Sequence, residues 1–172
     1  MNVLMVVAAV NFRDEELLDP KDALEEAGHH VTLASVARGK CSGVKGFQVP
    51  ATVALAKADA GDYGAVVFAG GEGARTLFDD PHAQRLAKQM IAQQKVVGAI
   101  CIAPVILARA GVLVHRHVSV FPTERIEIAE AGAFPMSAPV TVDGNLITAN
   151  GPAASMAFAD ALVTALAQRK AA

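Results

Sequence analysis

Short, continuous apolar runs alternate with longer segments of helical periodicity along this chain. The apolar runs are VLMVVA (3–8), HVTLASV (30–36), the AVVFAG of YGAVVFAGGEGA (65–70) and KVVGAI (95–100). A strand that is apolar on both faces is buried on both faces, which is typical of parallel sheets. The alternation therefore predicts an α/β fold, with a mostly parallel sheet between helices on both of its faces.

Helices are expected between and after these runs. We predict them over about 15–28, 75–94 and 152–170, with a short one after Pro122. Asp79-Asp80-Pro81 is a capping signal near the start of the second helix. The Gly-rich segment 39–53 predicts a hairpin excursion, and Asp143-Gly144 predicts a second hairpin within 138–151. With no repeat, linker or low-complexity tract, residues 1–172 are expected to form a single domain.

Composition narrows the class of protein. The chain is 53% hydrophobic and 19% charged, which is a globular profile. A net charge of −2 argues against a nucleic-acid or anionic-membrane partner. No apolar stretch has the roughly 18 residues that a membrane span needs, and the first run is too short for a signal peptide. Cys41 and Cys101 are therefore expected to be free thiols in a reducing cytoplasm.

One of these cysteines stands where a strand gives way to a helix. In VVGAICIAPVILARAG (96–111), Cys101 follows the apolar run directly. Ligands of open α/β sheets bind at the carboxyl ends of the strands. A thiol there faces unpaired amides and a helix dipole, which favour the thiolate and could hold an oxyanion. The alternative is a small buried hydrophobe, and the local pattern leaves both interpretations open.

Two other loops should reach the same edge of the sheet. Gly70 and Gly71 end the run in FAGGEGA (68–74), and glycines let a backbone approach a neighbouring site closely. The loop after the first run, NFRDEELLDP (11–20), is rich in acids. A carboxyl beside a thiolate would have a raised pKa and could hold or move a proton. Spacing alone does not choose among its four acids, which are Asp14, Glu15, Glu16 and Asp19.

Seven segments of the chain, taken together and in order, resemble those of one known protein family. They are EELLDP, EEAGHHVTLASV, VVFAGG, GAICIAP, FPT, VDGNLITANGP and FADALVTAL, and together they cover nearly the whole chain. In this order they resemble the ThiJ/PfpI superfamily, most closely the branch that contains the Parkinsonism-associated protein deglycase and bacterial ThiJ-like proteins. The resemblance implies a flavodoxin-like three-layer sandwich, a reactive cysteine on a nucleophile elbow, and a homodimer.

The resemblance also implies a role for particular residues. Cys101 matches the reactive cysteine, Glu16 matches the partner carboxyl, and Gly71 and Ile102 match two backbone amides that form an oxyanion pocket. We further expect Gly70, Phe121 and Pro122 to line the pocket.

Two functions follow from this resemblance. One is a cofactor-free enzyme of the glyoxalase III or protein deglycase type, a hydrolase or lyase acting on methylglyoxal, glyoxal or the adducts they form on protein side chains. The alternative is a redox-sensing or chaperone-like protein in which Cys101 is oxidised to a sulfinate, without physiological turnover.

Three positions depart from the family's pattern. Protease-like members carry a histidine immediately after the cysteine, and Ile102 stands there in this chain, which argues against a Cys-His protease. Phe121 occupies the position where the human-type branch has a histidine. Ala69 replaces the proline of a common PGG motif, a minor structural change.

The remaining candidates are weaker. Cys41 lacks a strand-to-helix elbow and is expected to be an incidental thiol. A further strand is expected at HVSV (117–120). His115 and His117 alternate at its edge, but without cysteine or acidic company they do not predict a metal site. No dinucleotide fingerprint, Walker sequence or G-x-S-x-G elbow occurs, so we expect no metal and no cofactor.

Overall fold

A seven-stranded sheet forms the centre of the computed structural model, which describes residues 1–171. In sheet order its strands are β11 (Val140–Asp143), β12 (Leu146–Ala149), β8 (Val96–Ile100), β7 (Ala65–Phe68), β1 (Asn2–Val6), β3 (His30–Ser35) and β6 (Val53–Ala54). All neighbours pair in parallel except β11, which is antiparallel to β12. The predicted mostly parallel sheet is confirmed.

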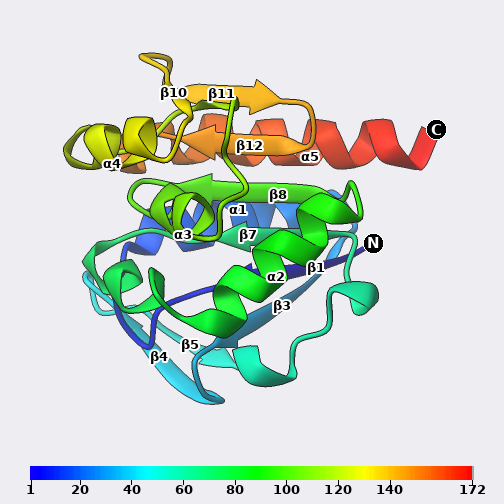
Figure 1. Cartoon of the computed structure of the whole chain (residues 1–172). Helices are drawn as coiled ribbons and strands as arrows, with labels where there is room; N and C mark the ends of the chain where they lie inside the picture. The colour runs from blue at the N-terminus through cyan, green and yellow to red at the C-terminus, as the bar shows by residue number, and fades with distance from the viewer. Residues whose placement is uncertain (172) are drawn as a thin grey trace.

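Helices cover both faces of this sheet. They are α1 (Asp14–Glu26), α2 (Pro81–Ala92), α3 (Pro104–Arg109), α4 (Arg125–Glu130) and α5 (Ser155–Ala171). Figure 1 shows α2 and α3 on the near face, with α1 and α5 packed together on the far face. The prediction of a flavodoxin-like, three-layer α/β arrangement is therefore also confirmed.

The three central strands are apolar because both of their faces are covered. Every residue of β7 and β8 is buried, as is every residue of β1 after Asn2. Helix α5 lies so close to β8 that a Cβ on Gly98 would stand 2.9 Å from Leu162 and 3.1 Å from Phe158. A residue without a side chain is what lets helix and strand approach this closely.

The second long helix begins later than its sequence pattern indicates. The side chain of Asp80 accepts hydrogen bonds from the backbone amides of His82 and Ala83, at 2.9 and 2.8 Å, so the capping signal is confirmed. The prediction of a helix from residue 75 is wrong, because the α-helix starts at Pro81. The preceding 3-10 helix η3 (Glu72–Leu77) is separate, since a residue before proline avoids the helical conformation.

Both predicted hairpins are present. Strands β4 (Gly39–Gly43) and β5 (Gln48–Ala51) pair antiparallel, and β11 and β12 are joined through Asp143-Gly144. An additional short strand, β2 (Val10–Phe12), pairs in parallel with β4 and was not predicted, because three residues carry no periodicity. The strand expected at HVSV is only the two-residue β9 (His117–Val118), paired with β10 (Phe134–Pro135).

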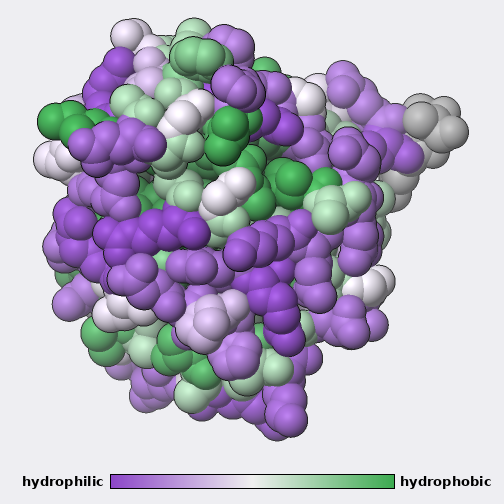
Figure 2. Space-filling view, in the orientation of Figure 1, coloured by the Kyte–Doolittle hydropathy of each residue, from purple (hydrophilic) through white to green (hydrophobic). Residues whose placement is uncertain are grey.

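The surface is largely polar on the face that Figure 2 shows, with small groups of hydrophobic residues between the hydrophilic ones. None of the helices in residues 1–171 combines the length and the hydropathy that crossing a bilayer requires.

Candidate active site

The carboxyl ends of β1, β7 and β8 meet at one edge of the sheet. These strands are adjacent, and the chain passes from β1 to β3 on one side and then to β7 on the other. Such a change of direction is where open α/β sheets bind ligands. The loops that leave these strands carry the first turn of α1, the Gly70-Gly71 pair and Cys101.

Cys101 sits in a backbone conformation that few residues with a side chain adopt. Its φ is +65°, in the left-handed region that costs about 1–2 kcal/mol for such a residue. Two hydrogen bonds hold it there. Its N–H donates to the carbonyl of Ala149 at 2.9 Å, and its carbonyl accepts from the N–H of Phe121 at 2.8 Å. Local strain held by tertiary bonds is common at functional sites.

Two backbone amides face the sulfur of Cys101, those of Gly71 and Ile102, and both lower the pKa of the thiol. Gly71 has a φ of +95°, and a Cβ there would lie 2.3 Å from the backbone nitrogen of Arg13. Only glycine fits this position without displacing the loop that follows β1. The six-residue α3 starts only at Pro104, so the nearest dipoles are individual amides and not a long helix.

Glu16 faces Cys101 from the first turn of α1. Its side chain is fully buried, and among the described residues only Cys101 is placed to hydrogen-bond its carboxyl oxygens. The thiol of Cys101 is the polar group turned toward it. A Cβ on Gly70 would stand 2.2 Å from Oε2 of Glu16 and 2.6 Å from Cβ of Cys101. Gly70 therefore leaves the space in which acid and thiol meet.

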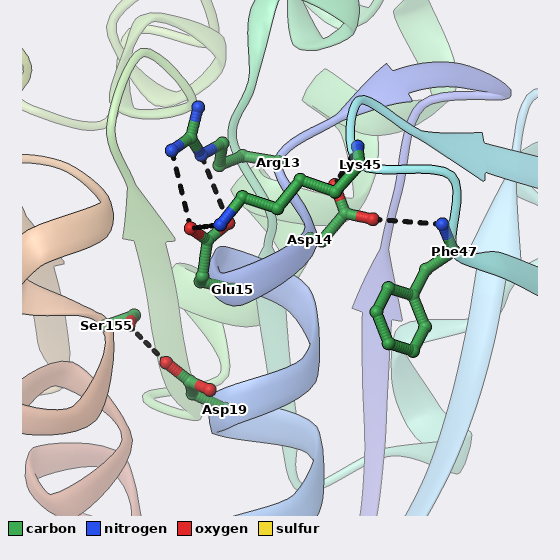
Figure 3. A network of polar contacts seen from close by, with 7 residues as sticks. All are labelled: Arg13, Asp14, Glu15, Asp19, Lys45, Phe47 and Ser155. Carbon is green, nitrogen blue, oxygen red and sulfur yellow. Dashed lines mark hydrogen bonds and ion pairs between the residues drawn. The ribbon is translucent and has the colours of Figure 1, made fainter.

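The structure also separates the four acids among which spacing did not choose. Figure 3 shows Asp14 turned toward the β4–β5 hairpin, Glu15 bonded to Arg13 and Lys45, and Asp19 receiving a hydrogen bond from Ser155. Of the four, Glu16 alone is turned to the cysteine.

Burial raises the pKa of both members of this pair. The pKa of Glu16 rises from 4.5 to about 7, mainly because its charge would be buried. The pKa of Cys101 rises to about 12, because its charge would also be buried and would lie beside a charged Glu16. The sequence predicted that the surroundings of Cys101 favour the thiolate, which means a lowered thiol pKa. When Glu16 is ionised the pKa of the thiol is raised instead, so the prediction is wrong for this state of the pair. Between these two values the pair keeps one proton and one negative charge.

A cavity of about 410 Å³ opens in front of the pair. Its wall is formed by Arg13, Glu16, Val44, Gly71, Glu72, Arg75, Cys101, Ile102, Phe121, Thr123 and Pro152. Gly70 and Pro122, which were expected in the lining, are not part of it. Gly70 lies behind Glu16 and Cys101, and Pro122 is exposed at the start of the 3-10 helix η4 (Pro122–Glu124).

Comparison with known proteins identifies the family to which this fold belongs. A model of the DJ-1/PfpI family matches residues 1–165. The chain belongs to the DJ-1/PfpI family.

Its relatives agree with this assignment. An uncharacterized protein of Methanocaldococcus jannaschii is 39% identical over 87% of this chain and 75% of its own length. A deglycase of Thermococcus kodakarensis is 34% identical over 87% of this chain and 90% of its own length. The crystal structure of a ThiJ/PfpI domain protein from Brachyspira murdochii superposes with a TM-score of 0.95 at 36% identity, covering 97% and 96% of the two chains. The resemblance predicted from the sequence is confirmed.

Two positions that depart from the DJ-1/PfpI pattern both line the cavity. Ile102 and Phe121 are the positions at which the sequence resemblance implied histidines in other members, and both line the cavity beside the Glu16–Cys101 pair. Neither side chain can accept a proton. In this DJ-1/PfpI chain Glu16 is therefore the ionisable group turned to the sulfur.

Two arginines of the cavity wall were missed by the sequence reasoning. Arg75 lies on η3, where its Nε donates to Glu72 at 2.6 Å and its Nη2 donates to Glu124 at 2.9 Å. Glu124 is buried, and it also accepts from the hydroxyl of Thr123 at 2.9 Å. Arg13 donates through Nε and Nη2 to Glu15, at 3.1 and 3.3 Å. No local signal in the sequence sets either arginine apart.

A carboxylate ties the β4–β5 hairpin to the start of α1. The two oxygens of the buried Asp14 accept hydrogen bonds from the backbone amides of Lys45 and Phe47, at 2.8 and 3.2 Å (Figure 3). A Cβ on Gly43 would lie 2.3 Å from Oδ1 of Asp14, so the turn closes over this carboxylate. The hairpin brings Val44 into the cavity wall.

His115 and His117, of the HRH segment (115–117), are not part of the cavity wall. His117 lies 3.4 Å from the carboxylate of Asp143, and the rings of His117 and His115 lie tilted beside that of Phe134, with centroids 5.3 and 6.4 Å from it. Within residues 1–171 no three side chains of the metal-binding types gather in one place.

Proposed function

We propose that this DJ-1/PfpI chain is a cysteine-dependent enzyme of the glyoxalase or deglycase type. Its substrates would be methylglyoxal, glyoxal or the adducts that these form on side chains. The observation that carries the proposal is the isolated pair of Glu16 and Cys101, buried together beneath a cavity and facing two backbone amides. Relatives that are named deglycases add support.

In the reactive state we place the shared proton on Glu16. The sulfur can then accept hydrogen bonds from the amides of Gly71 and Ile102 and from the O–H of Glu16. With the proton on sulfur, the carboxylate would be buried with only a weak S–H donor, since no other residue of the described chain donates to it. Leaving a buried charge without donors is costly, so hydrogen bonding favours the thiolate.

This arrangement supports a complete reaction with one added water. The thiolate of Cys101 adds to the aldehyde carbon of methylglyoxal, and the oxygen that becomes an alkoxide is stabilised by the amides. Glu16 gives its proton to this oxygen, which completes a hemithioacetal. As a carboxylate it then moves a proton from the former aldehyde carbon to the ketone carbon, while the hydroxyl proton passes from the first oxygen to the second, and a thioester with an α-hydroxyl group forms. Water cleaves the resulting thioester, which releases lactate and restores the thiol. Glyoxal would give glycolate by the same steps.

Cys101→Ser tests this proposal directly. A serine hydroxyl without an adjacent base of suitable strength is a poor nucleophile, so methylglyoxal consumption and lactate formation should fall by about a thousandfold or more. Cys41→Ser is the matched control, since Cys41 is a buried thiol of β4 outside the cavity wall. Undiminished consumption by Cys101→Ser refutes the proposal.

The same geometry favours a second function, redox sensing through Cys101. The two amides that would hold an alkoxide could also hold the oxygens of a sulfinate. Intact-protein mass after mild peroxide separates the two functions. Selective addition of two oxygens at Cys101 without aldehyde turnover supports sensing, and turnover with an unmodified cysteine supports the enzyme. A homodimer in the cytoplasm is part of either proposal.

A further inference from the structure

The cavity is much larger than a free dicarbonyl. If each heavy atom takes no more than the roughly 30 Å³ of a water molecule in the liquid, methylglyoxal fills at most about 150 Å³. The cavity in front of Cys101 measures about 410 Å³. Half or more of the cavity therefore remains for another part of the substrate. The side chains of the cavity wall should be complementary in charge and polarity to that part.

Apart from the Glu16–Cys101 pair, the polar side chains of this wall are those of Arg13, Glu72, Arg75 and Thr123, and the two guanidinium groups among them are held in place. Arg75 is fixed by the buried carboxylate of Glu124, which comes from another loop, and its guanidinium lies 5.7 Å from the ring centroid of Phe78. Arg13 is fixed by Glu15. An arginine fixed in this way loses little entropy when it binds an anion, because its planar group is already oriented.

Each of these arginines keeps a nitrogen for a ligand. Within the described residues, the hydrogen bonds of Arg13 and Arg75 use Nε and Nη2 only, and no bond involves Nη1. Figure 3 shows this third nitrogen of Arg13 without a contact. The nearby carboxylates of Glu15, Glu72 and Glu124 are already paired with arginine, so they leave the free N–H groups available.

We propose that Arg75, together with Arg13, binds a carboxylate on the part of the substrate that does not react. The proposal rests on the function assigned to Cys101 and gives it a substrate class. The preferred substrate is an aldehyde adduct of a small, carboxylate-bearing amine or thiol, such as a free amino acid. The adduct carbon lies at Cys101, and the carboxylate lies on the arginine wall. Charge-assisted bonds from guanidinium to carboxylate are strong and directional.

The chain contains a matched control for Arg75. Arg109 on α3 also lies over the ring of Phe78, at 5.2 Å, and also binds two carboxylates, those of Asp79 and Glu127. It is not part of the cavity wall. Arg75→Gln and Arg109→Gln therefore remove comparable contacts from two sides of one ring, but only the first changes the cavity.

The test compares two methylglyoxal hemithioacetals that differ by one charge. One is formed with N-acetylcysteine and the other with N-acetylcysteine amide, each with thiol in excess and the free aldehyde measured. We expect kcat/KM of the wild-type protein to favour the carboxylate adduct by about tenfold or more. Arg75→Gln should bring this ratio close to one, mainly by raising KM for the carboxylate adduct, and Arg109→Gln should preserve it.

A second variant covers the case in which Arg75→Gln folds poorly. Arg75→Lys keeps a cation beside Glu124 but loses the planar fork, so it should retain an intermediate preference. Equal kcat/KM for both adducts in the wild-type protein would overturn the inference and leave the proposed function standing. An equal loss of preference in Arg75→Gln and Arg109→Gln would have the same consequence. Consumption of free methylglyoxal but of neither adduct would overturn the inference alone. Consumption of neither the adducts nor free methylglyoxal would refute the proposed function, and the inference with it.

Discussion

The carboxyl of Glu16 and the thiol of Cys101 face each other across Gly70, from two elements far apart in the sequence. The space that they share is the space that a side chain at Gly70 would occupy. A charged Glu16 raises the pKa of Cys101, and a hydrogen bond from Cys101 lowers the pKa of Glu16, so the two act as one ionisable unit. Several measurable properties of the protein follow from this pairing.

Gly70→Ala should separate the pair. The new methyl group would lie 2.2 Å from the Glu16 carboxylate and 2.7 Å from the carbonyl of Ile100, and the backbone cannot move away cheaply. We expect a loss of about 1–3 kcal/mol in the free energy of unfolding and about a hundredfold loss of aldehyde turnover. Denaturant unfolding and methylglyoxal consumption measure the two effects.

The control for this substitution is Gly64→Ala. A Cβ at Gly64 would meet only the side chain of Met1, which is flexible and can move aside. This variant should keep full turnover. If Gly70→Ala also kept full turnover, the close approach of Glu16 and Cys101 would not matter for the reaction.

Glu16→Gln should make the protein more stable at alkaline pH while it removes activity. The pKa of Glu16 is about 7 in the folded protein, against 4.5 for an unperturbed glutamate, so between these values the folded state binds more protons than the unfolded one. The stability contributed by this extra proton of the Glu16–Cys101 pair is complete below pH 4.5 and is lost as the pair gives up its first proton near pH 7. A shift of this size corresponds to about 3 kcal/mol.

Urea unfolding at pH 5 and pH 8 measures this effect. The wild-type protein should lose stability relative to Glu16→Gln between the two values, because glutamine does not titrate. Glu26→Gln removes an exposed carboxyl from the same helix and controls for the change of net charge. A difference between wild type and Glu16→Gln that is the same at both pH values would contradict the raised pKa.

Asp14→Ala should release the β4–β5 turn from α1. The substitution removes two part-buried hydrogen bonds from the amides of Lys45 and Phe47 to a charged acceptor, which costs about 1–3 kcal/mol. Hydrogen exchange at these two amides should accelerate more than exchange elsewhere in the hairpin. Asp59→Ala, which removes an exposed cap from Gly61, should leave both amides unchanged. Unaltered exchange in Asp14→Ala would show that the turn is held by other contacts.

The fold was largely predictable because its central strands are buried on both faces. Burial of this kind produces the continuous apolar runs of β1, β7 and β8, and the turn signals at Asp80-Pro81 and Asp143-Gly144 act locally. The extra strand β2 was not predictable, since its three residues take their conformation from pairing with β4. A local pattern contains no information about such a distant partner.

The pairing of Cys101 with Glu16 was predictable, but several residues of the cavity wall and the electrostatics of the pair were not. The strand-to-helix turn singled out Cys101, and the family resemblance singled out Glu16 among four acids. The direction of the thiol pKa depended on how deeply the pair is buried, which one sequence does not show. Arg75 was missed for a related reason, because the buried Glu124 that orients it lies in a separate loop.

The pH dependence of Cys101 alkylation tests the shared proton most directly. In a Cys41→Ser background, the rate of reaction with iodoacetamide reports the thiolate of Cys101 alone. We expect this rate in the otherwise wild-type protein to rise with a midpoint near pH 7, where the pair loses its first proton and the thiolate forms. In Glu16→Gln the buried thiol must ionise unaided, so the midpoint should move above about 8.5, the ordinary value for cysteine. A midpoint near pH 12 that falls in Glu16→Gln, or identical titrations of the two proteins, would contradict a proton held by Glu16 beside an ionised sulfur.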